Sequence, residues 1–214
     1  MDQFPPDPTN PRTPSHITDI DGARVIVLAK RISFATSRLP AWNDQHKFYG
    51  DELLISALEE LALDLVLWLE DNGAPGLLVP YHHVDPLKFV KGEDTQATHP
   101  LSAEHAAVEA GLGTLGLNQQ LITPEYGPRV ILGLVLTSAD IEPDSMMEEV
   151  LCRGPECGRC LMACPADAVQ HWDRDWEACD KYLSPFGFEF LSDYLTNVLK
   201  EPDQANKIDM LRGM

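Results

Sequence analysis

Apolar residues along this 214-residue chain fall into runs with the lengths typical of alternating strands and helices. Residues 25–28 form a continuous apolar run with β-branched side chains, which predicts a strand covered on both faces. Residues 49–72 place leucines on several faces before Gly73, which predicts a long, largely buried helix. Further strands are expected at 76–83, 120–123 and 129–137, and further helices at 103–111, 146–151 and 188–200. This alternation predicts an α/β fold with a layered sheet.

The same pattern divides the chain into three parts. Residues 1–20 carry five prolines and predict an extended arm over the surface or a disordered lead. Residues 21–143 predict an α/β domain, and residues 144–214 a small C-terminal module that ends in a helix and a polar tail. No apolar run resembles a signal sequence or is long enough for a lone membrane span, so a soluble cytoplasmic protein is expected.

The charge balance is strongly acidic, with 34 Asp and Glu against 16 Lys and Arg and a net charge of -18. No cluster of basic residues stands out along the sequence. Such a chain is expected to repel a phosphate backbone, and the sequence therefore predicts no nucleic-acid partner.

Four of the five cysteines lie in thirteen positions, as Cys152, Cys157, Cys160 and Cys164, with the spacing C-x4-C-x2-C-x3-C-P. The last two intervals and the proline match the bacterial ferredoxin pattern, whereas the first interval is two residues longer. This predicts one 4Fe–4S cluster; a structural zinc site and buried, unligated thiols are the alternatives. The fourth ligand is Cys164, Cys179, a non-cysteine group or a residue of a second chain.

A second motif precedes the cysteines and has the form E-x-x-A-x-x-A-G-L-G-x-x-G-x-N over residues 104–118. Together with the cysteine run it resembles the epoxyqueuosine reductase and reductive dehalogenase superfamily, over residues 23–183. The resemblance implies a nitroreductase-like α/β domain that holds cobalamin, beside a ferredoxin-like module that reduces its cobalt. The cofactor-binding residues that it implies are Glu104, Gly111, Gly113, Gly116 and Asn118, with Arg129 contacting a carboxamide or phosphate of the cofactor.

Two departures from the family pattern shape the prediction. Thr98 stands where epoxyqueuosine reductases carry an acidic residue, and the cysteines that would follow Cys179 in a second set are missing. One cluster is therefore expected rather than two, and queuosine chemistry is not predicted. Apart from the resemblance, the glycines end a helix and so fail the context of a dinucleotide fingerprint. They either let the backbone approach a flat cofactor or cap the helix.

The candidate catalytic residues are Tyr81 and His82, at the end of an expected strand, and His99, next to the missing acid. The predicted function is an oxidoreductase: an external donor such as ferredoxin or flavodoxin reduces the cluster, and cobalamin then acts on a small organic substrate. The alternatives are an electron carrier or cluster-stabilised binding module without cobalamin, and a zinc-stapled interaction domain.

Overall fold

A three-stranded antiparallel sheet forms the centre of the computed structural model, which describes residues 24–40, 44–79, 101–183 and 188–212. The strand order is β1 (Arg24–Arg31), β5 (Val130–Thr137), β2 (Gly76–Val79), so the most apolar strand takes the central place. In the register, Arg24 faces Thr137 across the β1–β5 pair. The three strands predicted over these residues are confirmed.

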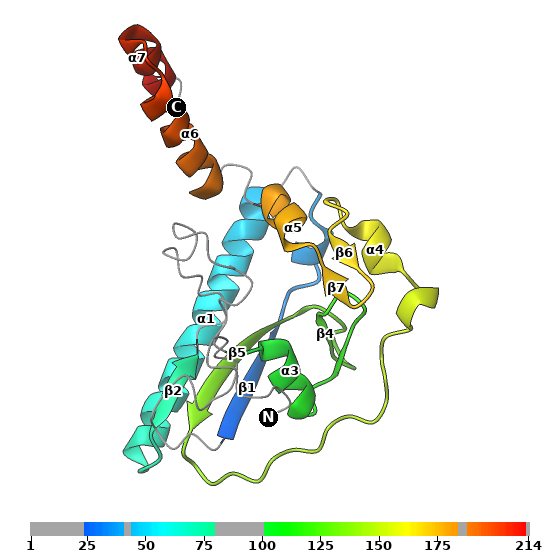
Figure 1. Cartoon of the computed structure of the whole chain (residues 1–214). Coiled ribbons are helices and arrows are strands. Elements are labelled where there is room, and N and C mark those ends of the chain that lie inside the picture. The colour runs from blue at the N-terminus through cyan, green and yellow to red at the C-terminus, as the bar shows by residue number, and fades with distance from the viewer. Residues whose placement is uncertain (1–23, 41–43, 80–100, 184–187, 213–214) are drawn as a thin grey trace.

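Two helices cover the sheet through separate apolar clusters. α1 (Asp44–Asp71) lies alongside the sheet (Figure 1) and buries Ala62, Val66 and Leu69 with Val135 of β5. α3 (Ala103–Glu109) packs with the alternate residues of β5, which are Leu132, Leu134 and Leu136. Because successive strand residues point to opposite faces, β5 needs apolar side chains throughout, as its sequence has.

Gly133 of β5 allows α1 to come close to the sheet. A Cβ atom at this position would lie 3.1 Å from Leu58 Cγ, and Leu58 is buried. The small residue thus makes room for a leucine in the α1 layer.

The remaining elements are short. η2 (Thr36–Arg38) follows β1, and the ribbon of β3 (Thr114–Leu115) and β4 (Leu121–Ile122) follows α3. The C-terminal part contains η4 (Gly154–Glu156), α4 (Arg159–Ala163), the hairpin of β6 (Val169–Gln170) and β7 (Asp173–Arg174), and then α5 (Trp176–Leu183), α6 (Phe188–Lys200) and α7 (Gln204–Arg212).

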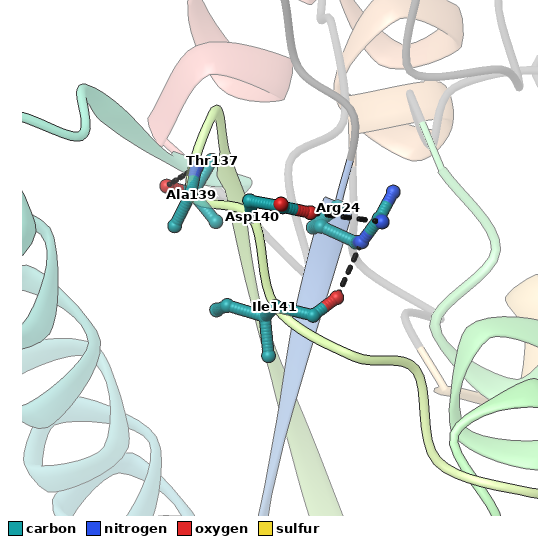
Figure 2. Close-up of polar contacts among 5 residues, drawn as sticks. All are labelled: Arg24, Thr137, Ala139, Asp140 and Ile141. Carbon is teal, nitrogen blue, oxygen red and sulfur yellow. Dashed lines mark hydrogen bonds and ion pairs between the residues drawn. The ribbon is translucent and has the colours of Figure 1, made fainter.

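The segment that leaves β5 is tied to β1 (Figure 2). Arg24 Nε donates to the carbonyl of Ile141 at 2.6 Å, and its guanidinium lies 3.5 Å from the Asp140 carboxylate. The N–H of Ala139 donates to Thr137 Oγ1 at 3.1 Å. These bonds fix the direction in which the chain leaves the sheet toward the cysteines.

Two sequence-based expectations are wrong. Residues 146–151 contain no helix, and Met146 and Val150 are 55% and 70% exposed, so no apolar face of this segment is buried. The expected polar tail instead contains α7, whose first turn is capped by Asp203: its carboxylate accepts the N–H of Asn206 at 2.9 Å. No helix in the described part of the chain is both long enough and apolar enough to span a membrane.

Candidate iron–sulfur site

The cysteine segment is a turn, a short helix and a second turn. Cys157 follows η4 and donates its N–H to the carbonyl of Gly154 at 3.1 Å. Gly158 has a φ of +54°, a left-handed conformation that allows the chain to turn directly into α4. Cys160 lies on α4, and Cys164 follows its last residue. All five cysteines of the chain are half-buried free thiols.

Backbone N–H groups point at two of these sulfurs. Cys152 Sγ accepts the N–H of Leu117 at 3.3 Å and that of Gly154 at 3.4 Å. Cys164 Sγ accepts the N–H of Ala168 at 3.3 Å. Hydrogen bonds of this kind favour a thiolate over a thiol, and they are one of the ways in which a protein sets the potential of an iron–sulfur cluster.

The pKa of Cys164 reflects this environment. Burial raises the pKa of the thiol, and the nearby carboxylate of Asp167 raises it further, but the N–H groups of Ala168, Val169 and Ala166 lower it. The net effect is a pKa below the ordinary value of a cysteine. At Cys164 the lowered pKa favours the thiolate, which is the form in which a cysteine binds metal.

The glycines of the earlier motif pack against the protein's own backbone. A Cβ on Gly113 would lie 2.1 Å from the carbonyl oxygen of Ile122, and one on Gly116 would lie 2.8 Å from Asn118 Oδ1. Gly111 has a φ of +73°, and a Cβ there would lie 2.3 Å from the carbonyl oxygen of Ser145. Absence of a side chain at these positions is thus explained by contacts within the chain.

Hydrogen bonds join this glycine segment to the cysteine segment. The side chain of Thr114 accepts the N–H of Leu151 at 3.1 Å, one residue before Cys152. Leu117 donates its N–H to Cys152 and accepts the N–H of Trp172 at its carbonyl, at 3.0 Å.

Further hydrogen bonds join the glycine segment to the β6–β7 hairpin. Gln119 Nε2 donates to the carbonyl of Trp172 at 2.7 Å, and the Arg174 guanidinium donates to the carbonyl of Asn118 at 3.4 Å. Residues 114–119 therefore bond to the start of the cysteine segment and to the β6–β7 hairpin that follows Cys164.

The other predicted site residues are spread over the structure. Glu104 lies in the first turn of α3, whose N-cap is Ser102. Asn118 Oδ1 accepts the N–H of Gln120 at 3.4 Å, and Arg129 donates to the carbonyl of Ile32 at 2.9 Å. The proposed roles of these residues toward a cofactor stay predictions, and Tyr81, His82 and His99 lie outside the described residues.

Cys179 lies on α5, apart in sequence from the other four cysteines. Its N–H donates to the carbonyl of Asp175 at 3.0 Å in the first turn of that helix. Within the described ranges, no three Cys, His, Asp or Glu side chains converge to hold a single metal ion. A cubane cluster needs a wider arrangement, because each of its irons takes its own ligand.

The sequence reasoning missed the contributions of Thr114 and Leu117. Thr114 is 8% exposed, and its hydroxyl is a specific partner for the cysteine segment. Leu117 contributes its backbone N–H, so the type of its side chain gives no sign of this role. The only signal that pointed to both was the family motif in which they lie.

Comparison with known proteins found relatives in two enzyme groups. The chain is 37% identical over 86 residues to an epoxyqueuosine reductase of Listeria monocytogenes, covering 40% of this chain and 22% of the relative. It is 39% identical over 83 residues to a tetrachloroethene reductive dehalogenase of Desulfitobacterium hafniense, covering 37% of this chain and 14% of the relative. The chain thus spans less than a quarter of the length of these two relatives. No family model matches the sequence.

A solved structure shares the fold. The catabolic reductive dehalogenase NpRdhA superposes with a TM-score of 0.58 at 18% identity, over 74% of this chain and 22% of that one. The mixed helix-and-sheet architecture is therefore that of a reductive dehalogenase, whereas the predicted nitroreductase-like layering stays a prediction. The fold and the cysteine site indicate a protein related to reductases. The relatives of this chain and the structures similar to it are epoxyqueuosine reductases and reductive dehalogenases, which confirms the resemblance read from the sequence.

The expectation of a small-molecule substrate and no nucleic acid is corrected by these matches. Epoxyqueuosine reductases are among the sequence relatives, and one solved epoxyqueuosine reductase is bound to a tRNA stem loop. The expectation rested on the net charge of -18, and net charge does not describe a local surface.

Proposed function

We propose that the chain is an iron–sulfur oxidoreductase in which Cys152, Cys157, Cys160 and Cys164 bind one 4Fe–4S cluster. The observation that carries the proposal is the set of N–H groups directed at Cys152 and Cys164 within a ferredoxin-like spacing. A cluster bound there supplies one-electron transfer from an external donor such as a ferredoxin or flavodoxin.

The protein's own groups hold the first and last ligands. Leu117 and Gly154 orient Cys152 and offset the negative charge of its sulfur, and Ala168 does the same for Cys164. We take Cys164 rather than Cys179 as the fourth ligand, because it belongs to the same turn–helix–turn and accepts a backbone N–H.

Cobalamin is the second proposed cofactor, and the support for it comes from the relatives. One similar structure, also 18% identical to this chain, carries a title that names B12-dependent dehalogenation. The glycines of residues 111–116 do not form a cradle for this cofactor, because the space beside them is filled by Ser145, Ile122 and Asn118.

Iron and zinc analysis of anaerobically reconstituted protein tests the cluster. We expect about four irons per chain and no zinc, and a large loss of iron in Cys152→Ser and Cys164→Ser. Cys179→Ser is the matched control and keeps its iron. Zinc in place of iron, or a loss of iron in Cys179→Ser with none in Cys164→Ser, contradicts the assignment.

Cobalamin binding is measured separately. Adding cobalamin to the anaerobic protein is expected to change the corrinoid absorption bands. Unchanged bands with full iron content favour the electron carrier over the cobalamin-dependent reductase.

A further inference from the structure

The last two described helices, α6 and α7, contact each other and extend away from the central sheet (Figure 1). The hydroxyl of Tyr194 on α6 donates to the carbonyl of Met210 on α7, and the Phe190 ring stacks on that of Tyr194 with 6.2 Å between the ring centres. Val198, four residues after Tyr194, is buried. One row of apolar side chains on α6 is therefore turned toward α7.

A second apolar row on α6, which we call the leucine row, consists of Leu191, Leu195 and Leu199. These residues recur at intervals of four, so they lie on one face of the helix. They are 37%, 45% and 78% exposed. The polar positions fill the other side of the helix and are Ser192, Asp193, Thr196, Asn197 and Lys200. Because an amphipathic helix presents its apolar face to a partner, the leucine row is a candidate docking surface.

The two helices are too short to form a stable unit by themselves. α6 has 13 residues and α7 has 9, and helices of this length are marginal in water without tertiary packing. α7 buries none of its residues, and its Ile208 and Leu211 are exposed. The pair therefore needs a further apolar surface, and the leucine row offers a place for it to pack.

The charge of this helix pair identifies a second copy of the chain as the partner. Residues 188–212 carry five Asp or Glu and three Lys or Arg, a net charge of -2, although the whole chain has -18. α1 also leaves leucines exposed, among them Leu63 at 49%, but it carries eight Asp or Glu and one lysine. Two copies of α1 would therefore repel each other, whereas two copies of the α6–α7 pair are nearly neutral.

The leucine row is also complementary to itself. When two α6 helices lie antiparallel with a two-fold axis beside Leu195, each Leu195 meets its counterpart and Leu191 of each copy meets Leu199 of the other. The same alignment brings Lys200 of one copy level with Phe190 of the other, and an ammonium group over a ring is favourable. A parallel alignment would instead place the two Lys200 side chains next to each other.

We propose that the leucine row of α6 binds the leucine row of a second copy of this chain and forms an antiparallel dimer. Each copy contributes α6 and α7, so the assembly is a four-helix bundle in which the two α6 helices meet at the centre. This assembly goes beyond the proposed function and does not depend on the cluster.

Sedimentation velocity on the full chain, from about 1 to 100 µM, tests the proposal. Protein with and without reconstituted iron is compared, so that a failure of the cluster assignment does not affect the result. The variants are Leu195→Glu and Lys200→Gln, and Leu63→Glu on α1 is the matched control, because it changes a leucine of similar exposure. Circular dichroism checks the helix content of each variant. Amide exchange of residues 191–200 at rising protein concentration gives a readout that needs no variant.

We expect the wild type to dimerise in this range and the amides of residues 191–200 to exchange more slowly as the dimer forms. Leu195→Glu places two carboxylates opposite each other at the two-fold axis and should weaken the dimer about a hundredfold. Lys200→Gln removes the ammonium groups from the Phe190 rings and should weaken it about two- to fivefold. Leu63→Glu should dimerise as the wild type does.

Three results overturn the proposal. The first is a wild-type chain that stays monomeric at the highest concentration. The second is a dimer that survives Leu195→Glu or is broken by Leu63→Glu, which would assign the interface to another surface. The third is stronger dimerisation of Lys200→Gln, since it would mean that the two lysines lie next to each other in a parallel pair.

Discussion

Replacement of Gly113 by alanine tests whether the glycine segment is packed as the structure shows. The new Cβ would lie 2.1 Å from the carbonyl oxygen of Ile122, 2.9 Å from its carbonyl carbon and 3.2 Å from the Cα of Thr123. All three are backbone atoms of the neighbouring strand β4 or the residue after it, so no side chain can rotate to relieve the clash. Strands β3 and β4 must separate, beginning at the pair of Thr114 and Ile122.

Overpacking of this kind costs about 1–3 kcal/mol. Because the contact is with backbone, we expect Gly113→Ala to lie near the upper end of that range in the free energy of unfolding, measured by urea titration. The shift also moves Leu117, four residues on, away from Cys152 Sγ, which it now reaches at 3.3 Å. Iron content after anaerobic reconstitution should therefore fall together with stability.

Gly50→Ala is the matched control. A Cβ at Gly50 would lie 3.6 Å from Thr36 Cγ2, an ordinary contact, and Gly50 lies inside α1. Alanine there should raise the free energy of unfolding by about 0.5–1 kcal/mol, through its helix propensity. If Gly113→Ala behaves like Gly50→Ala in stability and iron content, the packing argument for the glycine segment is refuted.

Three further substitutions test single contacts. Thr114→Val leaves the N–H of Leu151 without its acceptor and should lower the free energy of unfolding, measured in urea, by about 1–3 kcal/mol. Thr114→Ser keeps a hydroxyl acceptor and should retain most of this free energy. Equal stability of the two variants contradicts the hydrogen bond. Leu134→Ala removes a fully buried side chain between β5 and α3 and should cost about 2–5 kcal/mol in thermal unfolding; a loss well below this means that the core around it is loosely packed. Asp175→Ala removes the acceptor of the Ala178 N–H at the start of α5 and should cost about 1 kcal/mol with iron content unchanged; a loss of iron would point to Cys179 as a ligand.

Elements with a buried apolar surface could be predicted from the sequence. Strand β5 is apolar at almost every position because helices cover both of its faces, and the helix predicted at 103–111 is α3, whose small apolar residues are buried. The expected helix at 146–151 failed because local composition favours a helix that has nothing to pack against. α7 buries none of its residues, so it needs no apolar face that the sequence could reveal, and the cap at Asp203 was a local signal for it.

Only those features of the candidate site that depend on side-chain type could be predicted from the sequence. Cysteine spacing indicates the ligands, because thiols are rare and their intervals are constrained by the cluster. The N–H donors could not be predicted, since every residue except proline carries one and only the folded chain selects those that meet a sulfur.

The contacts of Leu117 show that the boundary predicted near residue 143 does not separate the candidate site into two independent parts. Leu117 belongs to the motif that the sequence assigned to the α/β domain, yet it bonds to Cys152 and to Trp172. Near Leu117 in sequence, Thr114 accepts a hydrogen bond from Leu151, and Asn118 accepts one from Arg174. Because Leu117, one of the two N–H donors to Cys152, lies on the glycine segment, binding of the proposed cluster and folding of that segment should stabilise each other. Iron should therefore protect the amides of residues 114–119 from hydrogen exchange more than those of β1, and equal protection of the two segments would show that the glycine segment and the cluster are not coupled.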